Sequence, residues 1–206
     1  MLPHNQKYIC LDTETTGLNL SYSEAWQVSW IVCEGKRVVD VHDRFPNVEN
    51  LQLSEGAARV TGFDRSVYNS KKEPLKNVWG DLKKYLYDPD YLIIGQNLLG
   101  YDVYILRALA LKLGEEPDFS YMDRILDTRP LGKAVRENIQ KPAGNIDMLS
   151  WQYKMMNDRS LKAKVSQLQL LKYFSIDFDK DKLHDGLYDV TKSFEIFLAI
   201  KKALKL

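Results

Sequence analysis

The sequence has few cysteines, no long apolar run and almost no excess charge. The two cysteines, Cys10 and Cys33, both lie inside apolar runs of a 206-residue chain. This placement is typical of buried, reduced thiols in a cytoplasmic protein, and two cysteines cannot form a disulfide framework. No apolar run approaches the ~20 residues of a membrane span, and residues 1–7 lack the apolar core of a secretory signal. We therefore expect a cytoplasmic protein with no membrane partner.

The charge balance and composition exclude several broad classes of protein. The 29 basic and 28 acidic residues give a net charge of +1, so any nucleic-acid signal must be local rather than global. Hydrophobic residues make up 45% and charged residues 28%, which excludes wholesale disorder, a collagen and a coiled-coil rod. No internal repeat and no Pro/Gly/Ser-rich linker divides the sequence. A single domain spanning residues 1–206 is therefore expected.

The hydrophobic pattern predicts an α/β domain with a mixed sheet, because strands come early and then alternate with helices. The expected strands are residues 8–11, 25–33, 37–45 and 91–94. The expected helices are residues 54–60, 74–87, 100–113, 165–173 and 187–205. The second and third strands would form a hairpin around Gly35.

Residues 129–164 form a basic stretch, with eight Lys and Arg residues against three acids. We expect it to belong to a basic helical insertion at about residues 115–164. Trp151 and Tyr153 lie within it, and basic residues with aromatics can follow a phosphate backbone and stack on bases. The alternative is a solvated helical region whose aromatic side chains belong to the core. Composition alone does not separate these two possibilities.

The end of the first expected strand carries an acidic cluster, Asp12-Thr13-Glu14-Thr15-Thr16-Gly17. Side chains two residues apart on a strand share a face, so Asp12 and Glu14 can lie together. Open α/β sheets bind their ligands at such strand ends. Two adjacent carboxylates repel each other unless a cation neutralises them, and Mg²⁺ and Mn²⁺ prefer oxygen ligands. The alternative is a polar loop in which Asp12 caps a turn.

Two further segments place acids near expected helix starts. Asp102 would lie in the first turn of a helix, where the helix dipole favours an anion, and by itself it is an ordinary helix acid. His184 and Asp189 lie where a loop leads into the C-terminal helix. An imidazole beside carboxylates can exchange a proton near neutral pH, although an isolated loop histidine is equally plausible here. The other two histidines, His4 and His42, lie away from the acidic motifs.

Together these segments resemble the DEDDh-type 3′–5′ exonucleases, the family of the proofreading subunit of bacterial DNA polymerase III, ribonuclease T and the three-prime repair exonucleases. The family's first motif, Asp-x-Glu-x-Thr-Gly, matches the acidic cluster that begins at Asp12. The second-motif aspartate matches Asp102, and the third motif, His followed five residues on by Asp, matches His184 and Asp189. The segment 54–63 looks like the family's helix and the turn after it, and Asp127-Thr128 resembles its Asp-Thr. The likeness runs from Tyr8 to about Ala199.

The resemblance implies a ribonuclease H-like fold, a five-stranded mixed sheet flanked by helices. It also implies hydrolysis of the last phosphodiester with two divalent cations, Mg²⁺ or Mn²⁺. The implied metal ligands are Asp12, Glu14, Asp102 and Asp189. His184 would be the fifth catalytic residue and would take the proton of the attacking water.

The resemblance also implies residues that bind the terminal nucleotide. These are Thr15 and Leu18 after the first motif, together with Thr61, Asn97 and Tyr101. Leu18 would wedge against the terminal bases, and Tyr101 and Thr61 would line the pocket. The sequence departs from the family's pattern at Gln96 and Thr61, where histidines are usual, and at Gln27, where a glutamate is common.

These features predict an enzyme that removes nucleotides from the 3′ end of single-stranded DNA, alone or within a replication or repair complex. An RNA-trimming 3′–5′ exoribonuclease is one alternative, because no residue reveals whether the site would bind or exclude the 2′-hydroxyl of RNA. The other alternative is a non-catalytic nucleic-acid-binding module. Pure binding, however, does not need four clustered carboxylates beside a polyanion. The sequence leaves the oligomeric state open.

Overall fold

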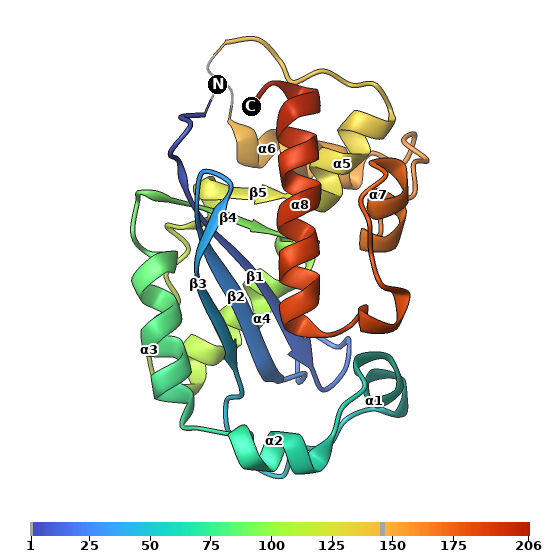
Figure 1. Cartoon of the computed structure of the whole chain (residues 1–206). Helices are drawn as coiled ribbons and strands as arrows, with labels where there is room; N and C mark the ends of the chain where they lie inside the picture. The colour runs from blue at the N-terminus through green and yellow to red at the C-terminus, as the bar shows by residue number, and fades with distance from the viewer. Residues whose placement is uncertain (1, 145–146) are drawn as a thin grey trace.

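The computed structural model describes residues 2–144 and 147–206, which fold around one five-stranded mixed sheet (Figure 1). The strand order is β3-β2-β1-β4-β5. Strands β1, β2 and β3 form an antiparallel meander, whereas β4 pairs parallel to β1 and β5 parallel to β4. The expected mixed α/β sheet flanked by helices is therefore confirmed.

The bounds of the elements agree with the sequence pattern wherever that pattern is strong. The strands are β1 (Lys7–Thr15), β2 (Ala25–Glu34), β3 (Arg37–Arg44), β4 (Tyr91–Gly95) and β5 (Ile125–Asp127). The α-helices are α1 (Glu55–Thr61), α2 (Arg65–Lys71), α3 (Leu75–Leu86), α4 (Asp102–Lys112), α5 (Thr128–Arg136), α6 (Met148–Asn157), α7 (Gln167–Tyr173) and α8 (Gly186–Leu204). Short 3₁₀ turns lie at Leu98–Gly100, Met122–Arg124 and Lys180–Lys182.

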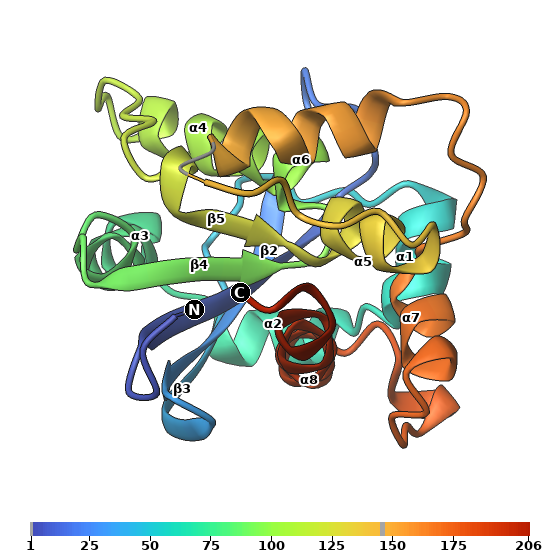
Figure 2. The same ribbon diagram turned by 90° about the horizontal axis from the view of Figure 1, so that it is seen from above.

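Alternation along β1 assigns its side chains to two different layers of the core. Ile9 and Leu11 belong to the cluster that includes the apolar residues of α3 and α4. Tyr8 and Cys10 belong to the cluster that includes the apolar residues of α8. Figure 2 shows α8 on one face of the sheet and α4 on the other. Even-numbered positions of β1 thus face α8, and odd-numbered positions face α4.

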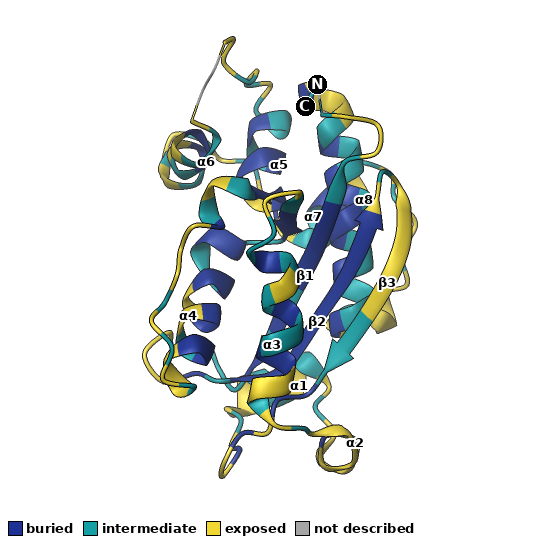
Figure 3. Ribbon diagram, turned by 90° about the vertical axis from the view of Figure 1, so that its left-hand side faces the viewer, coloured by how far each residue is buried: buried dark blue, intermediate teal, exposed yellow. Residues whose placement is uncertain are grey.

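The sheet is buried at its centre and exposed at one edge. Figure 3 shows β1 and β2 as mostly buried strands and β3 as an exposed edge strand. Both cysteines are buried free thiols, as the sequence predicts. Within residues 2–144 and 147–206, no helix is long and apolar enough to cross a membrane.

The basic stretch contains elements that the sequence pattern does not reveal. The insertion expected at about residues 115–164, to which it belongs, includes the strand β5 as well as the helices α5 and α6. Trp151 is buried in the core cluster that includes α8, and Tyr153 is half-buried against the cluster that includes α3 and α4. The structure therefore favours the core interpretation for these two aromatic side chains over base stacking.

Candidate active site

Asp12 and Glu14 lie at the carboxyl end of β1, on the face of the sheet that α8 covers. Their positions follow from alternation, because they continue the series that begins with Tyr8 and Cys10. Both side chains are half-buried, while Thr13 and Thr15 between and after them are buried. The two carboxylates therefore share one face at the sheet edge, as the sequence predicts.

Asp102 reaches the same edge from the first residue of α4. One of its carboxylate oxygens accepts hydrogen bonds from the Thr13 main-chain N–H, at 3.1 Å, and from the Thr13 hydroxyl, at 2.6 Å. Thr13 faces α4 because it occupies an odd-numbered position of β1. Asp102 is thus fixed to the strand residue that separates Asp12 from Glu14.

Asp189 comes from the first turn of α8. Helix α8 begins close to the sheet because residue 186 is glycine: a Cβ there would lie 2.6 Å from the Ser29 hydroxyl oxygen on β2. Asp185 caps this helix by accepting from the Tyr188 N–H, so its role differs from that of Asp189. Gln167, the first residue of α7, donates to the Asp189 main-chain oxygen at 2.7 Å and so ties the first turn of α8 to α7.

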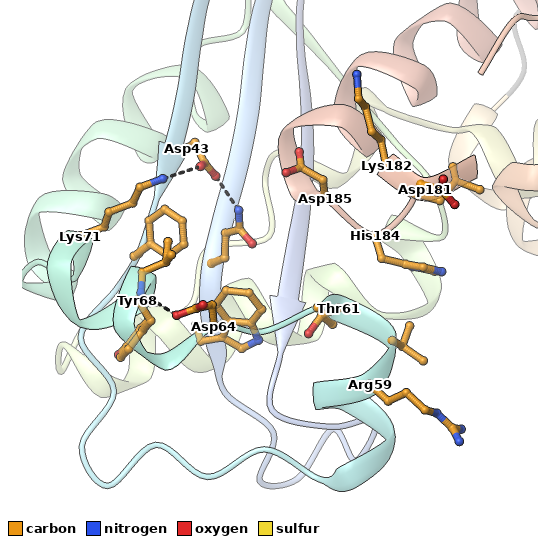
Figure 4. A pocket seen from close by; sticks show the side chains of 17 residues that line it. Asp43, Arg59, Thr61, Asp64, Tyr68, Lys71, Asp181, Lys182, His184 and Asp185 are labelled. Atoms are coloured by element: carbon orange, nitrogen blue, oxygen red, sulfur yellow. Dashed lines mark hydrogen bonds and ion pairs between the residues drawn. The ribbon is translucent and has the colours of Figure 1, made fainter. Parts of the chain in front are cut away.

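His184 contacts Asp189 through its main chain rather than its ring. Its N–H donates to the Asp189 carboxylate at 3.1 Å, and the residue adopts a left-handed backbone with φ 74°. The histidine side chain is exposed. It lines a hollow of about 480 Å³ between α1, α2 and the loop before α8. Figure 4 shows Thr61 of α1 and His184 on two facing segments of this hollow.

The four carboxylates destabilise one another's charged forms. Burial and the charges of Asp12, Asp189 and Asp102 raise the pKa of Glu14 to about 9. Burial, followed by the charge of Asp12, raises the pKa of Asp189 to about 7 and that of Asp102 well above its usual range. Burial raises the pKa of Asp12 to about 6. The charges of the other three carboxylates thus disfavour ionised Glu14, and the charge of Asp12 disfavours ionised Asp102 and Asp189.

The donor set fits hard divalent cations. Its members are carboxylates, and Asp189 Oδ1 is buried with no hydrogen-bond partner. An unpaired buried carboxylate oxygen is costly unless a cation or proton neutralises it. Among residues 2–144 and 147–206, no three Asp, Glu, His or Cys side chains already form a ready metal-binding group. Cation binding would therefore require small side-chain movements toward a shared centre.

Two of the expected nucleotide-binding residues, Thr15 and Tyr101, lie together in one small hydrogen-bond network. The Tyr101 hydroxyl donates to the Gly17 carbonyl at 2.5 Å and contacts the Thr15 hydroxyl at 2.7 Å. These bonds fix the loop that carries Leu18, whose side chain is 89% exposed. An exposed leucine on an anchored loop is available for contact with a base.

Thr61 and Asn97 are positioned differently from that network. The Thr61 hydroxyl donates to the Ala57 carbonyl within α1, so its methyl group is the part free to contact a ligand. The Asn97 side chain accepts from Arg129 at 2.5 Å and faces the basic α5 helix. Gln96, where the family often has histidine, donates to the Val165 carbonyl at 2.8 Å.

Asp127 holds the segment after β4 in place. The sequence indicates it only through the resemblance of Asp127-Thr128 to the family's Asp-Thr. Its buried carboxylate accepts from the N–H groups of Asn97 at 2.8 Å, Leu99 at 3.0 Å and Arg129 at 2.9 Å. Burial outweighs these bonds and raises its pKa to about 6. Asp127 thus connects the end of β5 to the segment that leads into Asp102.

Comparison with known proteins identifies the family. A family model described as exonuclease, of the RNase T type, matches residues 9–197. That range contains all four carboxylates and His184. The chain belongs to the DEDDh-type 3′–5′ exonuclease family.

This chain is similar in sequence to a DNA polymerase and similar in fold to exonuclease I. It is 25% identical over 134 residues to the PolC-type DNA polymerase III of Caldanaerobacter subterraneus subsp. tengcongensis, covering 65% of this chain and 9% of that protein. Escherichia coli exonuclease I with a 5cy-dT13 oligonucleotide superposes with a TM-score of 0.71 at 15% identity, covering 96% of this chain and 40% of that one.

A zinc-bound complex of E. coli exonuclease I with single-stranded DNA gives a TM-score of 0.72 at 16% identity, with coverage of 96% and 41%. The exonuclease chain therefore spans less than half the length of these relatives. The likeness to exonuclease I confirms the expected ribonuclease H-like fold.

Proposed function

We propose that this chain is a divalent-metal-dependent 3′–5′ exonuclease that shortens single-stranded DNA by two-metal hydrolysis of the terminal phosphodiester. The observation that carries the proposal is the convergence of Asp12, Glu14, Asp102 and Asp189 from three distant segments at one sheet edge. Their raised pKa values mean that this crowding is unfavourable without a counterion. A fold does not retain four repelling acids at one edge for stability alone.

These four carboxylates would hold two Mg²⁺ or Mn²⁺ ions. When bound, the ions would activate water and stabilise the charge that develops on the scissile phosphate. His184 would accept the proton of the attacking water, since its exposed ring lies next to the Asp189 turn. The hydrogen bond between Thr13 and Asp102 would hold the start of α4 against the end of β1.

Single-stranded DNA is the favoured substrate for two reasons. The related exonuclease I structures contain DNA oligonucleotides. In this chain, Leu18 projects from a loop that Tyr101 anchors, so the terminal base can stack against an apolar side chain without unwinding a duplex. A role within a replication or repair complex is compatible with the PolC-type relative.

The test uses matched 5′-labelled DNA and RNA oligomers with Mg²⁺, Mn²⁺ or a chelator. We expect a ladder of products that shortens from the 3′ end of DNA, and no product with the chelator. Asp189→Asn should abolish the ladder. Asp185→Asn is the matched control and should retain it, because asparagine caps a helix as well as aspartate does.

Two alternative outcomes have distinct signatures. Faster shortening of the RNA oligomer would establish an exoribonuclease instead. Binding of DNA by folded protein, without shortening in either metal, would identify a nucleic-acid-binding module and overturn the catalytic proposal.

A further inference from the structure

A second groove, outside the carboxylate cluster, lies between α5 and the irregular segment 158–166 that leads to α7. Figure 2 shows this segment running alongside α5 at the end of the sheet where β4 and β5 terminate. The groove has a volume of about 590 Å³. Its lining residues are Gln96, Asn97, Arg129, Pro130, Lys133, Met156, Leu161, Ala163, Lys164, Val165, Ser166, Gln167 and Gln169.

The charge of this groove is entirely positive. Arg129, Lys133 and Lys164 line it, and no lining residue is acidic. In the part of the chain that the structure describes, none of these three side chains forms an ion pair with a carboxylate. The hollow beside His184 differs, because four aspartates lie among its basic residues. The groove is thus the better match for a polyanion.

The walls of the groove are held in place by hydrogen bonds. Gln96 donates to the Val165 carbonyl at 2.8 Å, and Lys133 donates to the Asp158 carbonyl at 3.0 Å. Glu137, which follows α5 directly, accepts from the Ala163 N–H at 2.5 Å. These bonds fasten the irregular segment to α5 and to the end of β4, so the groove exists before a ligand arrives.

Two lining residues connect the groove to the carboxylate cluster. Gln167 donates to the Asp189 main-chain oxygen. Asn97 lies just after β4, in the segment that leads to Asp102. The Asn97 main-chain N–H donates to the Asp127 carboxylate, which holds this segment in place. The groove therefore shares Gln167 with the turn that carries Asp189, and Asn97 with the segment that leads to Asp102.

We infer that this groove binds the sugar–phosphate backbone of the substrate strand upstream of its 3′-terminal nucleotide. The inference rests on the proposed function and assigns a path to the strand that the cluster would cleave. Phosphates would contact the three basic side chains, while apolar lining residues such as Pro130, Met156 and Leu161 would contact sugars or bases. The groove selects a nucleic-acid backbone without reading its sequence.

The experiment compares Lys164→Glu with Lys162→Glu. Both lysines are exposed on the same segment, but Lys164 lines the groove and Lys162 does not. Lys164→Glu should weaken binding of a long single strand by roughly 3–10-fold and reduce the slope of log K against log salt by about 0.7 per lost phosphate contact. Lys162→Glu should leave affinity and slope close to those of the parent. Thermal melting checks that both variants fold.

A dinucleotide substrate separates failure of the groove from failure of the function. A dinucleotide without a 5′-phosphate has no phosphate upstream of the scissile one for Lys164 to contact, so Lys164→Glu should cleave it as fast as the parent while cleaving the long strand more slowly. Equal losses in the two lysine variants, or an equal loss on both substrates, would overturn the groove assignment. A parent protein that cleaves neither substrate would instead overturn the proposed function.

Discussion

The contact between His184 and Asp189 uses the histidine's main-chain N–H and leaves its ring free. The backbone of His184 is left-handed, a conformation that most non-glycine residues avoid and that histidine and asparagine adopt more readily. A loop residue held in this conformation next to an acidic cluster is consistent with a functional role for its side chain. The ring and the backbone of His184 can therefore be tested separately.

Replacing His184 with alanine or asparagine should lower kcat by roughly 10²–10⁴-fold, the usual contribution of a positioned general base. Asparagine accepts the left-handed backbone, so His184→Asn controls for a change in loop conformation. Mn²⁺ affinity should stay near that of the parent in both variants, since the carboxylates remain. Steady-state kinetics with labelled DNA and a Mn²⁺ titration measure the two effects. Parent-like kcat in both variants would show that the ring is not the proton acceptor.

At the scale of elements, the cluster depends on how closely α8 approaches β2. The Cβ built at Gly186 lies 2.6 Å from the Ser29 hydroxyl oxygen and 3.3 Å from the Gln27 amide. Any side chain larger than hydrogen would push the start of α8 away from the sheet. Asp189 would move with it, because it lies one turn further along the same helix.

Gly186→Ala should therefore lower the stability by about 1–3 kcal/mol and weaken metal binding. Gly80→Ala is the matched control within α3: no atom lies within 4 Å of its added Cβ, and alanine should stabilise that helix by roughly 0.5–1 kcal/mol. Chemical denaturation measures the first effect and a Mn²⁺ titration the second. Parent-like stability and metal affinity in Gly186→Ala would contradict the packing described here.

The sequence predicts those elements that carry a strong hydrophobic period. Strands β1 to β4 and helices α3, α4 and α8 follow from such runs, and α1 ends at the left-handed Gly62. The three residues of β5 are too few to display alternation, and α5 includes Pro130 and Gly132, two residue types with low helix propensity. These elements form because buried neighbours, not local preference, stabilise them.

The candidate site follows the same division between local pattern and tertiary contact. Alternation along β1 predicts the shared face of Asp12 and Glu14, and the family resemblance points to Asp102 and Asp189. No pattern predicts the Thr13–Asp102 hydrogen bonds, because they join residues 89 positions apart. The sequence indicates the basic stretch at residues 129–164 but not the groove, since Arg129 and Lys164 line one groove only after α5 and the irregular segment pack together.

At the scale of the whole molecule, the carboxylate cluster links stability to pH and to cations. Each folded pKa lies above its ordinary value, so the protonated form favours the folded state. The stabilisation of the folded state that comes from these raised pKa values is fully present below about pH 4. It is lost as the pH rises through about 6 for Asp12, about 7 for Asp189 and about 9 for Glu14.

In a chelator, the melting temperature should therefore fall between pH 5 and pH 9. Mg²⁺ should raise it more at the higher pH, because the cation binds deprotonated carboxylates in the folded state only. Differential scanning fluorimetry across pH, with and without Mg²⁺, provides the measurement. Asp12→Asn should reduce both the fall and the Mg²⁺ effect, since it removes one of the repelling charges. An Mg²⁺ effect that is independent of pH, or identical in the variant, would contradict this linkage.

The most direct test of a shared cation site is Mn²⁺ binding followed by electron paramagnetic resonance, with a nucleoside 5′-monophosphate present as product. In the parent chain we expect two bound Mn²⁺ ions close enough for spin coupling, as a two-metal centre requires. Asp12→Asn should lose the coupled signal and at least one ion, while Asp185→Asn should retain both. Absence of bound Mn²⁺ in the folded parent, or an unchanged coupled signal in Asp12→Asn, would show that Asp12, Glu14, Asp102 and Asp189 do not form one metal site.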